Sequence, residues 1–255
     1  MSTDMYTITR PFHIVRRVTF AIGGVAAVVM MTAQGLAQGA TSPDERVAAL
    51  IASLKENQTR LTRYEWIETT IISLKGEEKA RKQQRCYYGA DGKVQKLPIE
   101  SAAPPQAPSG GRGGRGGRLK ERIVENKKDE IQDYMAAAGQ LIQQYLPPNP
   151  AQIQAAKAAG NVAVKPLDAK SVQLAFSNYL QKGDSMAILI DAAANQLVGL
   201  ALTTYLEKPE DVVTLDVHFG SLTDGTRHVA QTVLDAKAKN IRVVVENTGY
   251  RPVSR

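Results

Sequence analysis

Residues 64–99 read YEWIETTIISLKGEEKARKQQRCYYGADGKVQKLPI, and this stretch decides the fold. Its first part, as far as Ile72, is dense in aromatic and β-branched residues, which favour a β-strand over a helix. Two later breaks, the second of them Asp91-Gly92, contain glycine and indicate tight turns. The stretch therefore predicts three consecutive strands, the second over Lys79–Tyr88 and the third over Lys93–Ile99. Such a meander needs other elements to cover one of its faces.

The residues before this stretch predict a helix over Thr41–Leu61. Ser42 is its expected N-cap, Pro43 takes the first helical position, and Glu45 completes a capping box. Apolar residues then recur at helical spacing, at Val47, Leu50, Ile51, Leu54 and Leu61. We expect the helix to pack this stripe against the sheet or, alternatively, to close the mouth of a cavity.

The N-terminus has the organisation of a secretory signal peptide over Met1–Ala37. Three arginines precede an apolar run over Val18–Ala33, and small residues follow it. An uncleaved anchor is the alternative, but the run is short for a membrane-spanning helix. We therefore expect cleavage after Ala37, a periplasmic or secreted location, and no transmembrane segment in the mature chain. The mature residues 38–255 are long enough for a single domain with a sizeable core.

After the meander the chain turns to low complexity and then to helix. Residues 101–118 are rich in proline, glycine and arginine, which predicts a flexible insert. The Gly-Gly-Arg units resemble RNA-binding tracts, but they lack the interleaved aromatic residues that stack on bases. An alternative partner is an anionic envelope surface, contacted through Arg112, Arg115 and Arg118. Residues 119–160 predict a helical insert of two helices, the first ending at Pro147 and the second capped by Asn149.

From Asp168 onward, alternating apolar residues and turn signals predict a return to β-structure. The expected strands contain Val172–Phe176, Met186–Ile190, Leu197–Leu206, Val212–Phe219, His228–Asp235 and Ile241–Glu246. Strands at this regular spacing indicate successive hairpins in an antiparallel sheet or barrel. The fold class that follows is α+β: an open, half-closed antiparallel β-barrel with covering helices, preceded by a signal peptide.

The pattern of polar residues predicts no catalytic residue, no metal site and no cofactor. Asp216, His218 and His228 fall on neighbouring predicted strands and suggest a transition-metal set, and Ser221 suggests a hydrolase. Neither reading has a supporting catalytic motif, because the chain contains no nucleophile elbow, helical zinc motif or phosphate loop. Cys86 is the single cysteine, so it forms no disulfide within the chain. We interpret it as a small buried apolar residue, the alternative being a reactive thiol.

The order of these elements resembles the LolA/LolB/RseB superfamily. The resemblance rests on an exported chain with a capped helix, a meander that opens with YEWIETT, a helical insert, and strands that end in VVVENTGYRPV. It covers most of residues 43–253. The resemblance implies a periplasmic, non-catalytic protein, with helices in the concave face of a half-closed barrel and a hydrophobic groove for lipid or lipoprotein acyl chains. It implies neither a cofactor nor a nucleic acid partner.

A concave sheet of this kind would offer apolar side chains to a ligand. The candidates are Trp66, Ile72, Leu74, Leu174, Phe176, Leu189, Leu200 and Leu202. The first functional hypothesis is therefore an exported binder or carrier of a lipid-like ligand. The alternative is a structural or interaction module of the cell envelope, whose barrel is filled by its own side chains and holds no ligand. The volume that the side chains leave unfilled separates the two.

Overall fold

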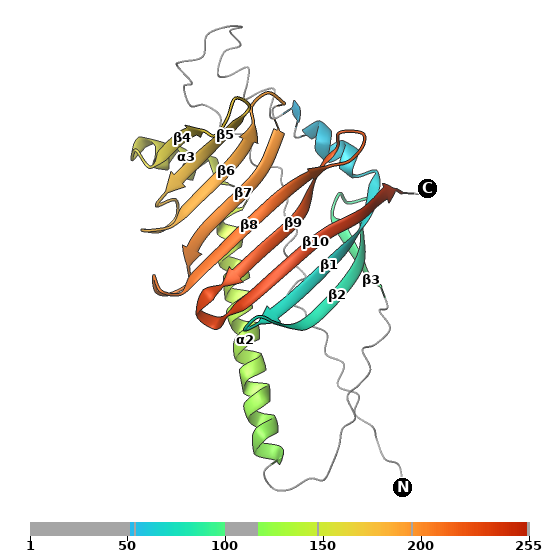
Figure 1. Cartoon of the computed structure of the whole chain (residues 1–255), viewed down its shortest axis with the longest axis vertical. Coiled ribbons are helices and arrows are strands. Elements are labelled where there is room, and N and C mark those ends of the chain that lie inside the picture. Colours follow the sequence, from blue (N-terminus) through green and yellow to red (C-terminus); the bar gives the residue numbers. More distant parts are fainter. Residues whose placement is uncertain (1–51, 54, 100–116, 147, 195, 254–255) are drawn as a thin grey trace.

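The computed structural model describes residues 52–53, 55–99, 117–146, 148–194 and 196–253 (Figure 1). The predicted signal peptide, the Ser42 cap and most of the glycine- and arginine-rich insert lie outside these residues, as do Arg112 and Arg115. Among the described helices, none is both long enough and apolar enough to cross a membrane.

Ten antiparallel strands form a single sheet in the order β3-β2-β1-β10-β9-β8-β7-β6-β5-β4 (Figure 1). The strands are β1 Tyr64–Leu74, β2 Glu77–Tyr88, β3 Val94–Pro98, β4 Val162–Pro166, β5 Ser171–Ser177, β6 Ser185–Asp191, β7 Gln196–Tyr205, β8 Val212–Ser221, β9 Arg227–Ala236 and β10 Ile241–Pro252. Within the described residues the sheet does not close, because β3 and β4 each have one neighbour. The predicted α+β class with an open antiparallel sheet is confirmed.

The N-terminal meander is present as the sequence predicts, with shifted boundaries: β3 covers Val94–Pro98, one residue shorter at each end than predicted. β2 begins at Glu77 rather than Lys79, because Lys75 and Gly76 both have positive φ and turn the chain in two residues. A short helix, η3 (Lys237–Lys239), makes the corresponding connection between β9 and β10. The pair β1–β10 joins the meander to the C-terminal strands, and its register runs from Tyr64 opposite Pro252 to Leu74 opposite Ile241.

Strand β4 is an element that the sequence analysis missed, since it placed the return to β-structure at Asp168. Val162–Pro166 is short and mostly exposed, and it pairs only with β5. An edge strand of this kind lacks the apolar alternation of a half-buried strand. Proline ends both edge strands, at Pro98 and Pro166, which removes a donor that another chain could pair with.

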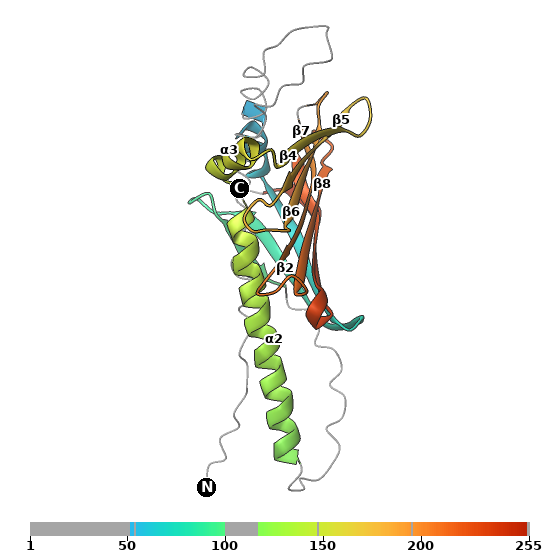
Figure 2. The ribbon, with the colours of Figure 1, turned by 90° about the vertical axis from the view of Figure 1, so that its left-hand side faces the viewer.

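The helices lie on one side of the sheet (Figure 2). Residues 52–53 and 55–61 are helical and lead into β1. α2 (Gly117–Tyr145) and α3 (Pro150–Ala158) connect the two edge strands and correspond to the two predicted helices, except that α2 begins at Gly117, two residues inside the predicted flexible insert. Asn149 caps α3 by accepting a hydrogen bond from the backbone N–H of Ala151 at 2.9 Å. We call the side of the sheet that faces α2 and α3 the helix face, and the opposite side the outer face.

The end of α2 is fixed to the sheet by a buried carboxylate, Asp184, in the loop between β5 and β6. Its oxygens accept hydrogen bonds from the backbone N–H groups of Tyr179, Leu180 and Gln181. The Tyr145 hydroxyl, at the C-terminus of α2, donates to the same carboxylate at 2.7 Å. Asp184 is only 2% exposed, so its carboxylate has lost its hydrogen bonds to water. The hydrogen bonds from the protein take their place.

We expect Asp184→Asn to lower the free energy of unfolding by about 2 kcal/mol, since the amide accepts fewer hydrogen bonds than the carboxylate. Asp191→Asn is the matched control. Asp191 also accepts two backbone N–H bonds in a turn, but it does so through Oδ1 alone, which asparagine retains. Urea unfolding measures both variants, and equal losses would show that Asp184 has no special role.

Candidate functional site

One apolar row crosses the helix face from β2 to β4. The strand register places its members directly opposite one another: Ala80, Ile72, Val243, Leu234, Leu215, Leu202, Met186, Phe176 and Val162. Cross-strand partners point to the same face of a sheet. The row therefore joins the meander to the C-terminal strands through one continuous apolar surface.

The part of this face on β5 to β8 is filled by the protein itself. Four of the predicted ligand-binding residues lie there, each between 1% and 6% exposed: Leu174, Phe176, Leu200 and Leu202. They belong to the core cluster with Ala138, Ile142 and Tyr145 of α2 and Ile153 and Ala156 of α3. Their exposure is so low because the helices cover them.

The part on β1, β9 and β10 is covered less completely. Five apolar side chains are half-buried there and form what we call the apolar strip: Ile72, Leu74, Leu234, Val243 and Val245. Ile72 and Leu74 were among the predicted residues, whereas the other three were not. Leu234 also packs against the core cluster, so the strip continues the core toward the meander.

The strip lies beside the point where α2 is held at the rim of the sheet. The Tyr134 hydroxyl donates to Asp211, in the loop between β7 and β8, at 2.5 Å. Lys239 of η3 forms an ion pair with Glu130 and lies 5.8 Å from the centre of the Tyr134 ring. Burial and the Asp211 carboxylate raise the pKa of Tyr134, which therefore stays protonated as a donor.

Beyond the strip, the helix face becomes polar. Glu68 and Lys96 form an ion pair in which the Lys96 ammonium lies 2.7 Å from both carboxylate oxygens. Glu68 is 7% exposed, so this pair is largely removed from water. Cys86 lies directly opposite both Trp66 and Lys96 and is fully buried. Burial, with a smaller effect of Glu68, raises the pKa of its thiol to about 12, which favours the interpretation of Cys86 as a buried apolar residue.

Four rings gather around Trp66 near the same end of the sheet. Trp66 stacks on Tyr250 with ring centres 5.5 Å apart, and Tyr88 lies 5.7 Å away. The Tyr250 ring in turn lies 4.2 Å from His228. The Trp66 indole donates to the side-chain oxygen of Asn247 at 3.0 Å. Burial raises the pKa of Tyr250 and lowers that of His228, so both rings are neutral near pH 7.

The remaining sequence candidates do not converge. Leu189 lies opposite Gly199, and Gly199 lies opposite His218, which places Leu189 on the outer face. His218 pairs with Gln231 and His228 with Gly220, so the two histidines are not direct cross-strand partners. In the described part of the chain, histidine, cysteine and carboxylate side chains form no group of three that could hold a metal ion.

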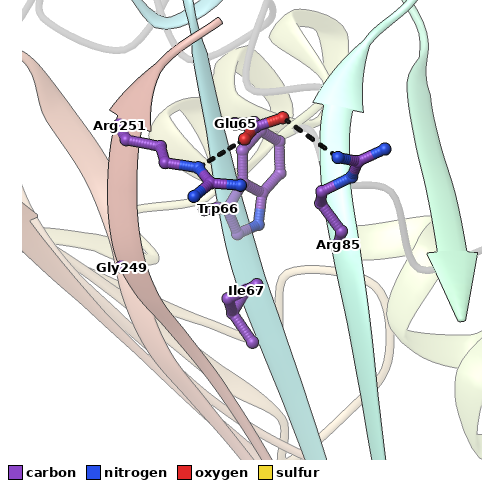
Figure 3. A pocket seen from close by; sticks show the side chains of 6 residues that line it. All are labelled: Glu65, Trp66, Ile67, Arg85, Gly249 and Arg251. Carbon is purple, nitrogen blue, oxygen red and sulfur yellow. Dashed lines mark hydrogen bonds and ion pairs between the residues drawn. The ribbon is translucent and has the colours of Figure 1, made fainter. Parts of the chain in front are cut away.

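A pocket of about 270 Å³ opens at an irregularity in the β1–β10 ladder (Figure 3). On β10, Gly249 and Tyr250 oppose the single residue Trp66, and Gly249 has φ +61°. This is a β-bulge with glycine in the left-handed conformation. The pocket is lined by Glu65, Trp66, Ile67, Arg85, Gly249 and Arg251. Sequence analysis missed this site, because it predicted the last strand over Ile241–Glu246, whereas β10 continues through Gly249 to Pro252.

Comparison with known proteins gives a weak likeness. No known family profile matches the sequence, and no curated protein matches it significantly. Two solved structures are similar to this chain. One is a DUF1329 family protein from Desulfovibrio piger, 12% identical, with a TM-score of 0.36 over 80% of this chain and 92% of that one. The other is a LolA superfamily protein from Nitrosomonas europaea, 6% identical, with a TM-score of 0.35 over 82% and 94%.

The second of these belongs to the superfamily that the sequence resembles. At TM-scores of this size the two likenesses decide neither the residues of a site nor a function. The functional argument therefore rests on the side chains of this chain.

We expect Lys96→Met to lower the free energy of unfolding by about 3 kcal/mol, because it leaves the Glu68 carboxylate buried without its partner. The double change Glu68→Gln with Lys96→Met removes both charges and should cost less. Lys79→Met is the control, since its ion pair with Glu77 on the same meander is exposed. The pair has no stabilising role if Lys96→Met and Lys79→Met have the same urea midpoint.

The lowered pKa of His228 predicts a loss of stability in mild acid. The unfolded chain takes up this proton near pH 6.5, whereas the folded chain takes it up only at lower pH. Acidification from pH 7.5 to 5.5 therefore favours unfolding. His228→Gln should reduce this pH dependence, whereas His218→Gln, at an exposed position on β8, should leave it unchanged. Urea midpoints at the two pH values measure the difference, and an undiminished pH dependence in His228→Gln would contradict the assignment.

Proposed function

We propose that this protein is a non-catalytic binder or carrier of a lipid-like ligand, which it holds against the apolar strip. The observation that carries the proposal is that Ile72, Leu74 and Val243 lie on the helix face but remain only half-buried. Their neighbours on β5 to β8 are almost fully covered by the helices. A half-covered surface that continues an apolar core can bind an apolar chain.

The energetic basis is the burial of hydrocarbon. Each methylene that leaves water contributes about 0.8 kcal/mol. Neighbouring strands are about 4.8 Å apart, so the strip spans about 10 Å from β1 to β9. A segment of an acyl chain fits this span, and the strip has no charged member that would have to lose its hydration. Selectivity for a headgroup would come from groups at the borders of the strip.

An exported location agrees with this proposal, because a lipid carrier moves its ligand through the space outside or between membranes. We infer that residues 1–37 direct the chain to the periplasm or the outside and are then removed, which leaves residues 38–255 as one domain forming a half-closed barrel. The support is the order of basic, apolar and small residues in the sequence. The arginine-rich residues 112–118 would strengthen contact with an anionic envelope surface.

The alternative is an envelope interaction module that holds no ligand. The complete burial of Leu174, Phe176 and Leu202 favours it, because the protein's own helices already occupy that part of the helix face. The two proposed functions differ in whether a ligand binds to the apolar strip. An experiment must therefore perturb the strip and leave the core under α2 intact.

Val243 and Val244 provide a matched pair for that experiment. They are consecutive half-buried residues of β10, and the alternation of the strand points them to opposite faces. We expect the wild-type chain to bind the neutral dye N-phenyl-1-naphthylamine with enhanced fluorescence. Val243→Gln should weaken binding by about tenfold, which corresponds to the lost apolar contact. Val244→Gln should bind as the wild type does.

Native mass spectrometry of the chain purified without detergent from a bacterial host tests the same proposal. We expect a protein mass that lacks residues 1–37 and an additional lipid mass that organic extraction removes. An apo mass together with no dye binding would refute the carrier function and favour the interaction module. Equal dye binding by Val243→Gln and Val244→Gln would place any bound ligand away from the strip.

A further inference from the structure

The pocket at the β-bulge lies on a different part of the molecule from the apolar strip. Glu65 and Ile67 of β1 alternate with the residues that point to the helix face, and Arg85 lies opposite Ile67 on β2. The pocket that these side chains line therefore opens on the outer face. A function on the helix face leaves this pocket unexplained.

The pocket contains more positively charged groups than negatively charged ones. Figure 3 shows Arg251 and Arg85 reaching toward the Glu65 carboxylate from either side. Nε of Arg251 donates to one carboxylate oxygen, and a guanidinium nitrogen of Arg85 lies 4.0 Å from the other. Two cations thus share one carboxylate, which leaves a formal charge of +1 at the mouth of the pocket. A bound anion of single charge would balance it.

The geometry leaves guanidinium donors for such an anion. The bond to Glu65 engages Arg251 through Nε, so it does not occupy the two Nη groups. The 4.0 Å separation from Arg85 is longer than a hydrogen bond. The side chains of Arg85 and Arg251 are 45% and 67% exposed, whereas that of Glu65 is 15% exposed. The carboxylate is therefore the fixed part of the site, and the guanidinium groups remain accessible to a ligand.

The rest of the lining is apolar. Ile67 and Trp66 line the pocket, although the Trp66 indole itself points to the helix face, and Gly249 adds no side chain to it. A Cβ at Gly249 would lie 3.6 Å from Cγ1 of Ile67, so glycine at the bulge keeps this space open. The volume of about 270 Å³ suits a compact molecule rather than a long chain.

We propose that the bulge pocket between Arg85 and Arg251 is a binding site for a small organic monocarboxylate with a compact apolar body. The carboxylate of the ligand accepts hydrogen bonds from the two guanidinium groups, whose planar donor edges match it. The apolar body lies against Ile67 and the backbone of Trp66 and Gly249. Glu65 orients the two arginines and limits the ligand to a single negative charge, because a second charge would be left unbalanced.

Trp66 borders the pocket and is the single tryptophan of the chain, so its fluorescence reports a change at this site. We expect phenylacetate to change the tryptophan fluorescence of the full chain saturably at low ionic strength. Phenylacetamide has the same ring without the charge, and acetate has the charge without the ring, so each should bind at least about tenfold more weakly. Added salt should weaken phenylacetate binding, because the arginines are exposed.

Matched variants separate the pocket from other surfaces. Arg85→Gln and Arg251→Gln should each weaken phenylacetate binding by about tenfold or more, the effect of losing one charged hydrogen bond. Arg81→Gln changes an arginine on the same face of β2 outside the pocket, and Arg242→Gln does the same on β10. Both should bind phenylacetate as the wild type does. Circular dichroism verifies that all four variants are folded.

Several results would overturn the proposal. These are the absence of a saturable fluorescence change, equal binding of phenylacetate and phenylacetamide, or unchanged binding by the two pocket variants. Val243→Gln distinguishes this site from the apolar strip, since that change should weaken dye binding by about tenfold and leave phenylacetate binding intact. A loss of both ligands in Val243→Gln would assign phenylacetate to the strip and remove the outer site.

Discussion

The antiparallel pairing of β1 with β10 is the constraint on which the rest of the structure depends. It joins Tyr64 to Pro252 at one end and Leu74 to Ile241 at the other, so segments from opposite halves of the chain become neighbours. The other ladders connect strands that follow one another in sequence. Without the β1–β10 pair, the three-stranded meander would have no covered face and would not be stable alone. Closing so long a loop is entropically costly, and contacts of this separation form slowly during folding.

This pairing also creates the two candidate sites. It brings Ile72 and Leu74 beside Val243 and Val245, which makes the apolar strip a continuation of the core. It contains the bulge at Gly249, where β10 has one residue more than β1. The strip and the bulge pocket thus lie on opposite faces of the same ladder. Trp66 belongs to both environments, because it lines the pocket and also stacks on Tyr250.

Helix α2 divides the helix face into a filled part and a half-covered part. Its C-terminus is held by the bond from Tyr145 to Asp184, and its middle is held at the rim by Tyr134 and Glu130. These two attachments fix the path of the helix across the sheet. Ala138 and Ile142 of this helix belong to the core cluster that covers β5 to β8. The polar contacts at two points on α2 therefore help to set which part of the helix face is filled.

The sequence by itself determined the elements of this protein and most of their boundaries, because the signals are local: Gly76 at a turn, Asn149 at a cap, and apolar alternation along the later strands. It did not reveal β4, whose exposed edge position removes the alternation. It also could not choose among the apolar candidates. Alternation fails in a run such as Ile188-Leu189-Ile190, so Leu189 was not recognisable as an outer-face residue, and nothing local predicts that α2 covers Leu174 and leaves Ile72 half-buried. The covering of the helix face by α2, the strand pairing and the bulge pocket depend on contacts between residues that are distant in sequence. Only the tertiary structure decides those contacts.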